Sequence, residues 1–534
     1  MVYSPLLLIF LPIITALIVY LFKNKHIKYL ALFSQAILSI VTVLYFIEFQ
    51  SDFSKTTVVL GNWDSLIGIS LSNDAISFTF MFLTLFIWWM ILIYVFDAKN
   101  THHNFLFFLL FLEGVFFGLL QTNDLFNMFV FLELTTVLVT VLIAFKKSGE
   151  SFRAGLYYLL LNSSGVLAFL MGIILVYYTF GTINILEIKT LMPLYANETI
   201  VIFAYALMLA GISVKSAFFP LFTWLPKAHG ASQSAISALL SGLIVKAGLY
   251  LFIRINYMFL ETAINVEDIF FYIGVSGALI GGILAWGQTS IKQLLAYSTV
   301  SQIGLILMGL SSVEVRLFYG GFYHILNHGL AKMLLFLAAG IIIKVYRTKD
   351  IDKIQGVFKV MPLVSIAMII AMLSITGAPF LGGSVSKTMI KYGLEAEPIK
   401  YYLLYAVNIS TIVIMLKLSV IFFKEPLVTF YMKRILQLFV LIGTALAIII
   451  LGVFYSPLTA VLFDIDLSGF KVNSLNAGFD YLVSVVVACL IYFGVVYKER
   501  AFFKRLRKYR LSFETANVIF IGYLALLASM FVLF

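Results

Sequence analysis

The sequence predicts an all-α, polytopic membrane bundle of about sixteen transmembrane helices. Three observations carry this prediction. Of the 534 residues, 62% are hydrophobic and only 11% are charged, whereas a soluble domain has about 25% charged residues. The mean hydropathy is +1.06. Sixteen apolar stretches each approach the length of about 20 residues that spans a bilayer, so little chain remains for a domain outside the membrane.

Charged or turn residues bound each apolar stretch. The stretches lie at residues 4–22, 27–47, 74–96, 104–121, 125–145, 154–180, 199–222, 232–255, 267–287, 293–311, 317–343, 361–395, 401–423, 434–455, 479–497 and 513–534. The first follows MVYSP without a basic segment or a small-residue cleavage site, so we expect a retained span and not a signal peptide. Between the second and third, TTVVLGNWDSLIGISLSND predicts a short hairpin outside the membrane.

The basic residues are unequally divided between the two ends of the predicted spans. If odd-numbered spans run inward, the inner loops contain 24 Lys and Arg residues and the outer loops contain 7. This bias predicts a multi-pass protein of the cell (inner) membrane with both termini outside. Cytoplasmic loops facing anionic membrane lipid also explain the net charge of +11, so nucleic acid is not an expected partner.

The cysteine content excludes several chemistries. Cys489 is the single cysteine, and it lies in an apolar stretch, which excludes a disulfide framework and a Cys-ligated iron–sulfur cluster. We therefore expect no cofactor, no metal and no electron transfer within this chain.

The seventh and twelfth spans are interrupted by Pro and Gly, at residues 211–230 and 374–393. Such breaks are tolerated at membrane depth only where the freed backbone faces protein or water. Because the breaks are five spans apart, and five crossings reverse the direction of the chain, we expect two inverted five-helix repeats. The predicted divisions are three N-terminal helices with an outer hairpin (1–100), the two repeats (101–256 and 257–430), and helices 14–16 with a basic cytoplasmic linker (431–534).

Ionisable residues inside membrane spans are costly and by default mark ion or proton paths. Glu133 and Lys215 have opposite charges, so burial favours a pair, which is either a static salt bridge or a proton switch. Lys246 and Lys387 have no evident acidic partner in the sequence, and a buried lysine can take up and release a proton. For Lys387, extension of the side chain toward the membrane surface is the alternative.

Three titratable residues recur every four positions in the eleventh span. His324, His328 and Lys332 therefore lie along one face of a helix over about 12 Å. Such a row predicts a hydrated proton relay. The alternative, a zinc site at the two histidines, has no acidic third ligand nearby.

Several segments resemble the antiporter-like, proton-translocating subunits shared by respiratory complex I, membrane-bound hydrogenases and Mrp-type Na+/H+ antiporters. The resemblance covers roughly residues 60–430 and is strongest to the D subunits of Mrp antiporters. The matching segments are DLFNMFVFLEL (124–134), KSAFFPLFTWLPKAHGASQSAISALLSGLIVKAGLYLFIR (215–254), IKQLLAYSTVSQIGLILMGL (291–310), HILNHGLAKMLLFLAAG (324–340) and GAPFLGGSVSK (377–387).

The resemblance assigns roles to the buried residues. It implies that Glu133 is the fifth-helix glutamate, Lys215 its partner, Lys246 the central lysine and Lys387 the exit residue. The same resemblance makes His324, His328 and Lys332 the polar row of the eleventh helix. Accessory candidates are Glu113, Asp124, His229 and Lys417. Glu113 is interpreted as a second partner near Glu133, a subunit contact or a packing residue.

We therefore expect the proton-translocating membrane subunit of a multisubunit Mrp-type antiporter, with other membrane subunits as partners and H+, alone or together with Na+, as cargo. Two features depart from the Mrp D pattern: Pro379-Phe380 replaces a double proline, and two spans follow the fourteenth. These features leave open a proton-pumping subunit of a complex I-like NADH dehydrogenase or of a membrane-bound hydrogenase. A stand-alone solute transporter and an inert membrane scaffold are alternatives of another class.

Overall fold

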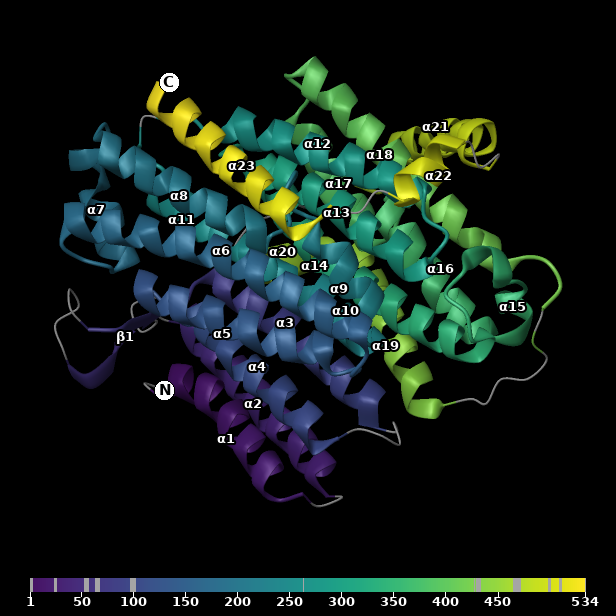
Figure 1. Cartoon of the computed structure of the whole chain (residues 1–534), viewed down its shortest axis with the longest axis horizontal. Coiled ribbons are helices and arrows are strands. Elements are labelled where there is room, and N and C mark those ends of the chain that lie inside the picture. Colours follow the sequence, from purple (N-terminus) through teal and green to yellow (C-terminus); the bar gives the residue numbers. More distant parts are fainter. Residues whose placement is uncertain are drawn as a thin grey trace. The chain divides into compact units, whose positions relative to one another are not determined.

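The protein folds as an almost entirely helical chain, which confirms the predicted all-α class (Figure 1). The computed structural model describes residues 3–23, 26–51, 57–62, 68–96, 102–262, 264–426, 428, 434–463, 472–497, 501–508 and 511–533. Contacts divide the chain into two compact units. Unit 1 comprises Met1–Ser216, Val245–Asn265 and Phe513–Phe534, and unit 2 comprises Ala217–Ile244 and Val266–Ser512.

Unit 1 contains the N-terminal helices, one hairpin and the last helix of the chain. Its elements are α1 (Ser4–Leu21), α2 (Ile27–Ser51), β1 (Thr57–Val59), η2 (Leu60–Asn62), β2 (Ser70–Ser72), α3 (Ala75–Phe96), α4 (His103–Gln121), α5 (Leu125–Ala144), α6 (Gly149–Phe180), α7 (Ile185–Tyr195), α8 (Thr199–Lys215), α11 (Val245–Met258) and α23 (Phe513–Leu533).

Unit 2 contains the remaining elements. They are α9 (Trp224–Ala231), α10 (Ser234–Leu239), the π-helical turn η3 (Leu240–Ile244), α12 (Glu267–Trp286), α13 (Ile291–Leu310), α14 (Val315–Tyr346), η4 (Ile351–Lys353), α15 (Val357–Val360), α16 (Pro362–Thr376), α17 (Gly382–Gly393), α18 (Pro398–Ser419), η5 (Val420–Phe422), α19 (Ile435–Val453), α20 (Tyr455–Phe463), α21 (Leu475–Ile491), η6 (Tyr492–Val496) and α22 (Ala501–Lys508).

The helix lengths confirm a multi-pass membrane protein. In the described part of the chain, fourteen helices are long and apolar enough to cross a bilayer. Two shorter apolar helices, α8 and α16, lie in the predicted seventh and twelfth spans. Each of the sixteen predicted stretches therefore corresponds to a helix or to an interrupted helix, because the breaks shorten only these two spans.

Both predicted helix breaks are present. In the seventh span, α8 ends at Lys215 and the next helix begins at Trp224. In the twelfth, α16 ends at Thr376 and α17 begins at Gly382. Gly377 caps α16 with a φ of +89°, a conformation that favours glycine because a Cβ would be strained there. The inverted relation between the two five-helix repeats, and their boundaries, stay predictions.

The predicted hairpin is also present. Strand β1 pairs with β2 in antiparallel register, with Val58 opposite Leu71. Residues 63–67 at its tip lie outside the described residues. The hairpin is tied to the segment after α4, because the Asn123 backbone N–H donates to the Ser70 carbonyl at 3.0 Å.

Small residues allow close packing around α8 in unit 1. A Cβ built on Gly165 of α6 would lie 3.0 Å from the Gly211 carbonyl of α8, so these two backbones are nearly in contact. Such small-residue contacts replace the hydrophobic driving force that is missing between helices in lipid. The last helix, α23, packs on the same α8, where Tyr523 and Ser213 share a hydrogen bond of 3.0 Å (Figure 1).

Candidate functional site

In unit 1, the Lys215 ammonium is held by neutral hydroxyl groups. Lys215 is the last residue of α8, and its side chain is buried. Its Nζ donates to Thr136 Oγ1 at 2.7 Å and to Tyr158 Oη at 3.4 Å. The C-terminal end of a helix carries a partial negative charge, which also favours an ammonium at this position.

The predicted pair of Glu133 and Lys215 is not a direct ion pair in this structure. One carboxylate oxygen of Glu133 accepts a hydrogen bond from Ser163 Oγ at 2.7 Å. The other, Oε2, is buried and receives no hydrogen bond from a described residue. Thr136 lies three residues after Glu133 and therefore on the same face of α5, and its hydroxyl is the group that Lys215 contacts. The Lys215 ammonium therefore contacts a hydroxyl group on the same face of α5 as Glu133, whose Oε2 has no hydrogen-bond donor among the described residues.

Lys246 is completely buried near the start of α11. The residues before it, Leu240–Ile244, form a π-helical turn, and such turns are frequent at functional sites. The first turns of α11 also pass very close to the end of α8. A Cβ on Gly248 would lie only 2.7 Å from the backbone N of Ser216, the residue after Lys215. Close packing therefore fixes the helix segments that carry Lys215 and Lys246.

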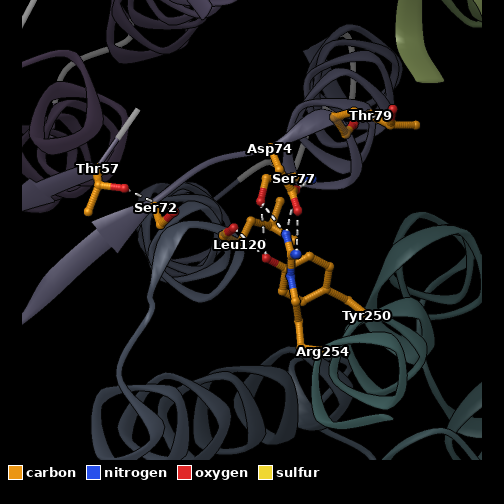
Figure 2. A network of polar contacts seen from close by, with 9 residues as sticks. Thr57, Ser72, Asp74, Ser77, Thr79, Leu120, Tyr250 and Arg254 are labelled. Atoms are coloured by element: carbon orange, nitrogen blue, oxygen red, sulfur yellow. Dashed lines mark hydrogen bonds and ion pairs between the residues drawn. The ribbon is translucent and has the colours of Figure 1, made fainter. Parts of the chain in front are cut away.

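A polar network holds the other end of α11 (Figure 2). Arg254 forms a two-pronged ion pair with Asp74, at the start of α3, with distances of 2.6 and 2.7 Å. Its guanidinium also donates to Ser77 Oγ at 2.7 Å. Tyr250, one turn earlier, donates to the Leu120 carbonyl at 2.6 Å and lies 3.2 Å from the same Ser77 hydroxyl. Lys246, Tyr250 and Arg254 recur every four residues, so they lie along one face of α11.

Electrostatics favour the charged state of the Asp74–Arg254 pair. Partial burial opposes ionisation of Asp74, but the Arg254 guanidinium and hydrogen bonds from Ser77 hold the pKa of Asp74 below its usual 3.8. Sequence reasoning did not find this network, because Arg254 lies at the end of its predicted span and counts there only among the seven basic residues of the outer loops. The spacing Lys-x3-Tyr-x3-Arg on one helix was the signal that would have found it.

In unit 2, His324 of α14 connects three helices through both ring nitrogens. Gln302 of α13 donates from its amide nitrogen to Thr411 Oγ1 at 2.9 Å, so its carbonyl oxygen accepts from His324 Nε2 at 3.0 Å. His324 Nδ1 lies 2.8 Å from Ser386 Oγ on α17. The helices that contribute these contacts are thereby fixed around one imidazole.

The orientation of the Ser386 hydroxyl is linked to the charge of His324, because this hydroxyl has acceptors on its own helix as well as on the imidazole. It can donate to His324 Nδ1, which requires a neutral imidazole, or to the Gly383 carbonyl at 3.2 Å. In the second orientation His324 Nδ1 can donate to Ser386, as a protonated imidazole does. Rotation of one hydroxyl therefore accommodates both protonation states without moving a helix.

The other residues of the predicted row are also buried on α14. The rings of His324 and His328 are 6.3 Å apart at an interplanar angle of 18°. Lys332 donates from Nζ to Ser298 Oγ at 2.6 Å and to the Leu295 carbonyl at 3.1 Å, both on α13. The structure thus confirms that the three side chains lie along one buried helix, although their role in proton transfer stays a prediction.

Lys387 lies beside the break in the twelfth span. Its Nζ donates to the carbonyl of Thr376, the last residue of α16, at 3.2 Å. A Cβ on Gly377 would lie 2.9 Å from Lys387 Cδ, so the glycine leaves room for the lysine chain. Lys387 therefore places its ammonium at the C-terminus of α16 within a broken span, whereas Lys215 is itself the last residue before the other break.

The four accessory candidates have local contacts. Asp124 caps α5 by accepting a hydrogen bond from the Asn127 N–H at 2.6 Å. Burial raises the pKa of Asp124 above its usual value, although hydrogen bonds from backbone N–H groups oppose this shift. Lys417 donates to the carbonyl of Trp286, the last residue of α12. His229 stacks on Phe336 with ring centroids 4.5 Å apart.

Glu113, the fourth accessory candidate, is fully buried on α4. It lies beside the Gln35 amide of α2. Its contacts place it among the N-terminal helices, and the partnership with the Glu133 region stays a prediction. In the described residues, no group of three or more His, Cys, Asp or Glu side chains gathers in a metal-binding arrangement.

These features define a class of protein. The chain is a multi-pass helical membrane protein with discontinuous helices, and buried lysines lie at the ends of the broken segments. Broken helices that direct their ends toward charged groups are typical of ion-transporting membrane proteins.

Comparison with known proteins identifies the family. The family model described as NADH:quinone oxidoreductase/Mrp antiporter, TM, matches residues 122–415. The NADH-quinone oxidoreductase subunit N of Desulforudis audaxviator is 30% identical over 387 residues, which cover 71% of this chain and 76% of the relative. The putative antiporter subunit mnhD2 of Staphylococcus aureus is 29% identical over 459 residues, which cover 82% and 91%. The chain belongs to this NADH:quinone oxidoreductase/Mrp antiporter family.

Two solved structures resemble the fold over nearly their whole length. A chain of the membrane-bound sulfane sulfur reductase, an archaeal respiratory membrane complex, has a TM-score of 0.81 and 26% identity, covering 91% of this chain and 99% of that chain. A chain of the Mrp complex of Dietzia sp. DQ12-45-1b has a TM-score of 0.80 and covers 95% and 99%. At 21% identity, the second likeness supports the fold alone.

The first prediction concerns the Asp74–Arg254 pair. Because the folded-state pKa of Asp74 is lowered, the pair stabilises the protein fully above about pH 4 and loses its contribution as the pH falls through the folded-state pKa. We expect Asp74→Asn to lower the free energy of unfolding by about 1 kcal/mol at pH 7. The measurement is thermal unfolding of the purified assembly at pH 7 and at pH 3.

The difference between wild type and Asp74→Asn should shrink from pH 7 to pH 3, because Asp74 of the unfolded chain then binds a proton more readily than Asp74 of the folded protein, which lowers the stability of the wild type. Arg254→Lys, which keeps the charge but loses the two-pronged geometry, is the control and should be less stable than wild type at pH 7. A difference that stays constant between pH 7 and pH 3 would contradict an ionised Asp74.

Proposed function

We propose that this chain is the proton-translocating membrane subunit of a multisubunit Mrp-type cation/proton antiporter. The proposal rests on family membership, on the 91% coverage of an antiporter subunit, and on one structural observation. Three buried lysines, Lys215, Lys332 and Lys387, donate to hydroxyl or backbone carbonyl oxygens and form no direct ion pair with a described carboxylate. Such lysines are suited to gain and lose protons.

The reason is electrostatic. A carboxylate in contact with a buried lysine would favour the charged ammonium strongly, whereas hydroxyl and carbonyl oxygens favour it weakly. Burial disfavours the charge. A lysine held only by neutral oxygens is therefore balanced between the two protonation states, and a charge arriving nearby changes that balance because charges interact strongly in a low dielectric.

In the proposed mechanism, Glu133 controls the proton on Lys215. When the Lys215 ammonium approaches the vacant Oε2 of Glu133, the pair holds the proton on the lysine. When the ammonium rests on Thr136 and Tyr158, as in this structure, the proton is free to leave. Lys246, buried in the same unit, is proposed as the next acceptor.

In unit 2 the proposed carriers are His324, His328, Lys332 and Lys387. Rotation of Ser386 lets His324 accept or release a proton without a helix movement. Ser386 and Lys387 are adjacent on α17, which couples the charge of the imidazole to the lysine at the helix break. No cofactor takes part in these steps, which use only the side chains of this chain and water.

A redox-driven pump module is the second candidate. It is favoured by the likeness to a subunit of a sulfane sulfur reductase complex and by 30% identity to a subunit N. Identification of the partner subunits after mild purification distinguishes the two, because electron carriers would accompany a pump module and other antiporter subunits would accompany an antiporter. The stand-alone transporter hypothesis requires flux from the chain alone, and the scaffold hypothesis requires that the buried lysines be dispensable.

For its location, we propose the cell membrane with both termini outside. The support is the excess of basic residues in the loops that would then be cytoplasmic. In this orientation, contact with anionic lipid stabilises the basic segment 498–510. The proposed cargo of this chain is H+. Na+ crosses the complex either through this chain or through a partner subunit.

The second prediction concerns Lys246. We expect Lys246→Ala to reduce ion-coupled transport by about 10²-fold, because a positioned proton carrier is lost. Lys246→Arg should not restore transport, since a guanidinium does not deprotonate in a protein. The measurement is proton and Na+ flux in vesicles that contain the assembled complex, with subunit abundance followed by blotting. Full activity of the assembled arginine variant would contradict a protonation cycle at Lys246.

The third prediction concerns topology. Single cysteines introduced in a Cys489→Ala background should react with a membrane-impermeant maleimide from outside at position 476 and from the cytoplasm at position 349. The reason is the predicted orientation of their loops by basic residues. Labelling of position 349 from outside in intact cells would overturn the whole orientation.

A further inference from the structure

The α21 helix lies beyond the family match at residues 122–415 and yet contributes side chains next to Lys387. It packs against α18 within unit 2. Its first two turns carry Asp480 and Tyr481. These residues belong to the two C-terminal spans that follow the fourteenth, to which no role is assigned by the family resemblance.

A polar cavity of about 320 Å³ connects these residues with Lys387. Helices α17, α18 and α21 form its walls, and Lys387, Lys391, Tyr405 and Asp480 are among the residues that line it. Glu395, also in the lining, is exposed on the surface of the protein. The cavity therefore leads from the buried lysine to the surface at the C-terminal end of α17.

Asp480 is the acidic group of a charged cluster in this cavity. One of its oxygens lies 2.5 Å from the ammonium of Lys391, the residue one helical turn after Lys387. The same oxygen accepts from Tyr405 Oη of α18 at 3.3 Å. The side chains of Lys391 and Asp480 are 27% and 40% exposed, so both contact the solvent in the cavity.

A second contact joins α21 to the Lys387 site. Thr376, whose carbonyl accepts the hydrogen bond from Lys387, shares a hydroxyl hydrogen bond of 2.9 Å with Tyr481. Thr376 and Tyr481 also line a separate apolar cavity of about 720 Å³. Their hydrogen bond therefore stands at the wall between the polar cavity and the apolar one, and it fixes α21 against the end of α16.

We propose that Asp480 is the proton acceptor through which Lys387 discharges to the membrane surface. This inference rests on the proposed function and deepens it by naming the group that follows Lys387. Lys387 and Asp480 line the same polar cavity, the Asp480 carboxylate already contacts the Lys391 ammonium there, and the cavity reaches the surface.

The proton balance of the step is simple. The Lys387 ammonium gives one proton to cavity water and becomes a neutral amine, and the water passes a proton to the Asp480 carboxylate, which becomes a neutral acid. The neutral acid no longer attracts the Lys391 ammonium, so the ion pair opens. Asp480 then releases the proton to the solvent at the mouth of the cavity, and the ion pair with Lys391 forms again.

The experiment compares flux in vesicles that contain the assembled complex. We expect Asp480→Asn to lower proton-coupled flux by about tenfold or more, since a positioned proton acceptor contributes about 10²–10⁴-fold. Asp480→Glu keeps a carboxylate and should retain most of the flux. The control is Asp268→Asn, which removes an exposed carboxylate paired with Lys400 at 2.6 Å and should transport as wild type does.

The variant Lys391→Met distinguishes a proton-transfer role of Asp480 from a purely structural role of its ion pair with Lys391. It breaks the same ion pair but leaves the carboxylate, so a proton acceptor at Asp480 predicts a much smaller loss than in Asp480→Asn. Equal losses in the two variants, or an assembled Asp480→Glu variant without flux, would overturn the inference. Wild-type flux in Asp480→Asn would overturn it as well.

Lys387→Ala distinguishes the inference from the function on which it rests. If Lys387→Ala abolishes flux and Asp480→Asn does not, the role of Asp480 is wrong and the proposed function stands. If assembled Lys387→Ala transports as wild type does, the proposed proton path itself is wrong. Subunit abundance is followed by blotting in every variant, and Asp480→Glu serves as the test if Asp480→Asn does not assemble.

Discussion

The free energy of burying ammonium groups in an apolar helical bundle constrains the rest of this structure. An isolated charge in such an interior is costly unless polar groups compensate it. Here the compensation comes from hydroxyl groups, backbone carbonyls and helix C-termini around Lys215, Lys332 and Lys387. Interactions with these partners offset enough of the desolvation cost for a lysine to be buried. They are too weak to hold the lysine permanently in its charged form. A proton carrier needs both properties.

The broken helices follow from the same constraint. In a continuous helix most carbonyls already accept an intrahelical hydrogen bond, so they can offer an ammonium only a second, shared acceptor position, as Leu295 does for Lys332. The break after Thr376 frees the carbonyl that Lys387 contacts, and the end of α8 places Lys215 at a helix terminus. Close packing then fixes these ends, as Gly248 does against Ser216 and α23 does against α8. The fold and the proposed chemistry are therefore linked through the same few backbone groups.

The sequence predicted the spans, the two breaks and the buried lysines, because long apolar stretches, Pro and Gly, and isolated charges are local signals. It did not predict the partners of those charges. Thr136, Ser386 and Asp480 are common polar residues whose importance depends on contacts between distant segments, which no local pattern reveals. The predicted Glu133–Lys215 contact shows the same limit, since charge signs indicate attraction but do not say which of several nearby oxygens the ammonium occupies.

Contacts with neutral oxygens leave a buried lysine able to release its proton, and substitutions at Thr136 test this most directly. Thr136→Asp places a carboxylate beside Lys215 and should hold its proton permanently, because an adjacent opposite charge favours the charged form. Thr136→Asn has nearly the same shape without the charge. The measurement is proton flux through the assembled complex containing each variant. The account predicts flux in Thr136→Asn and its loss in Thr136→Asp; equal flux in the two variants would contradict it.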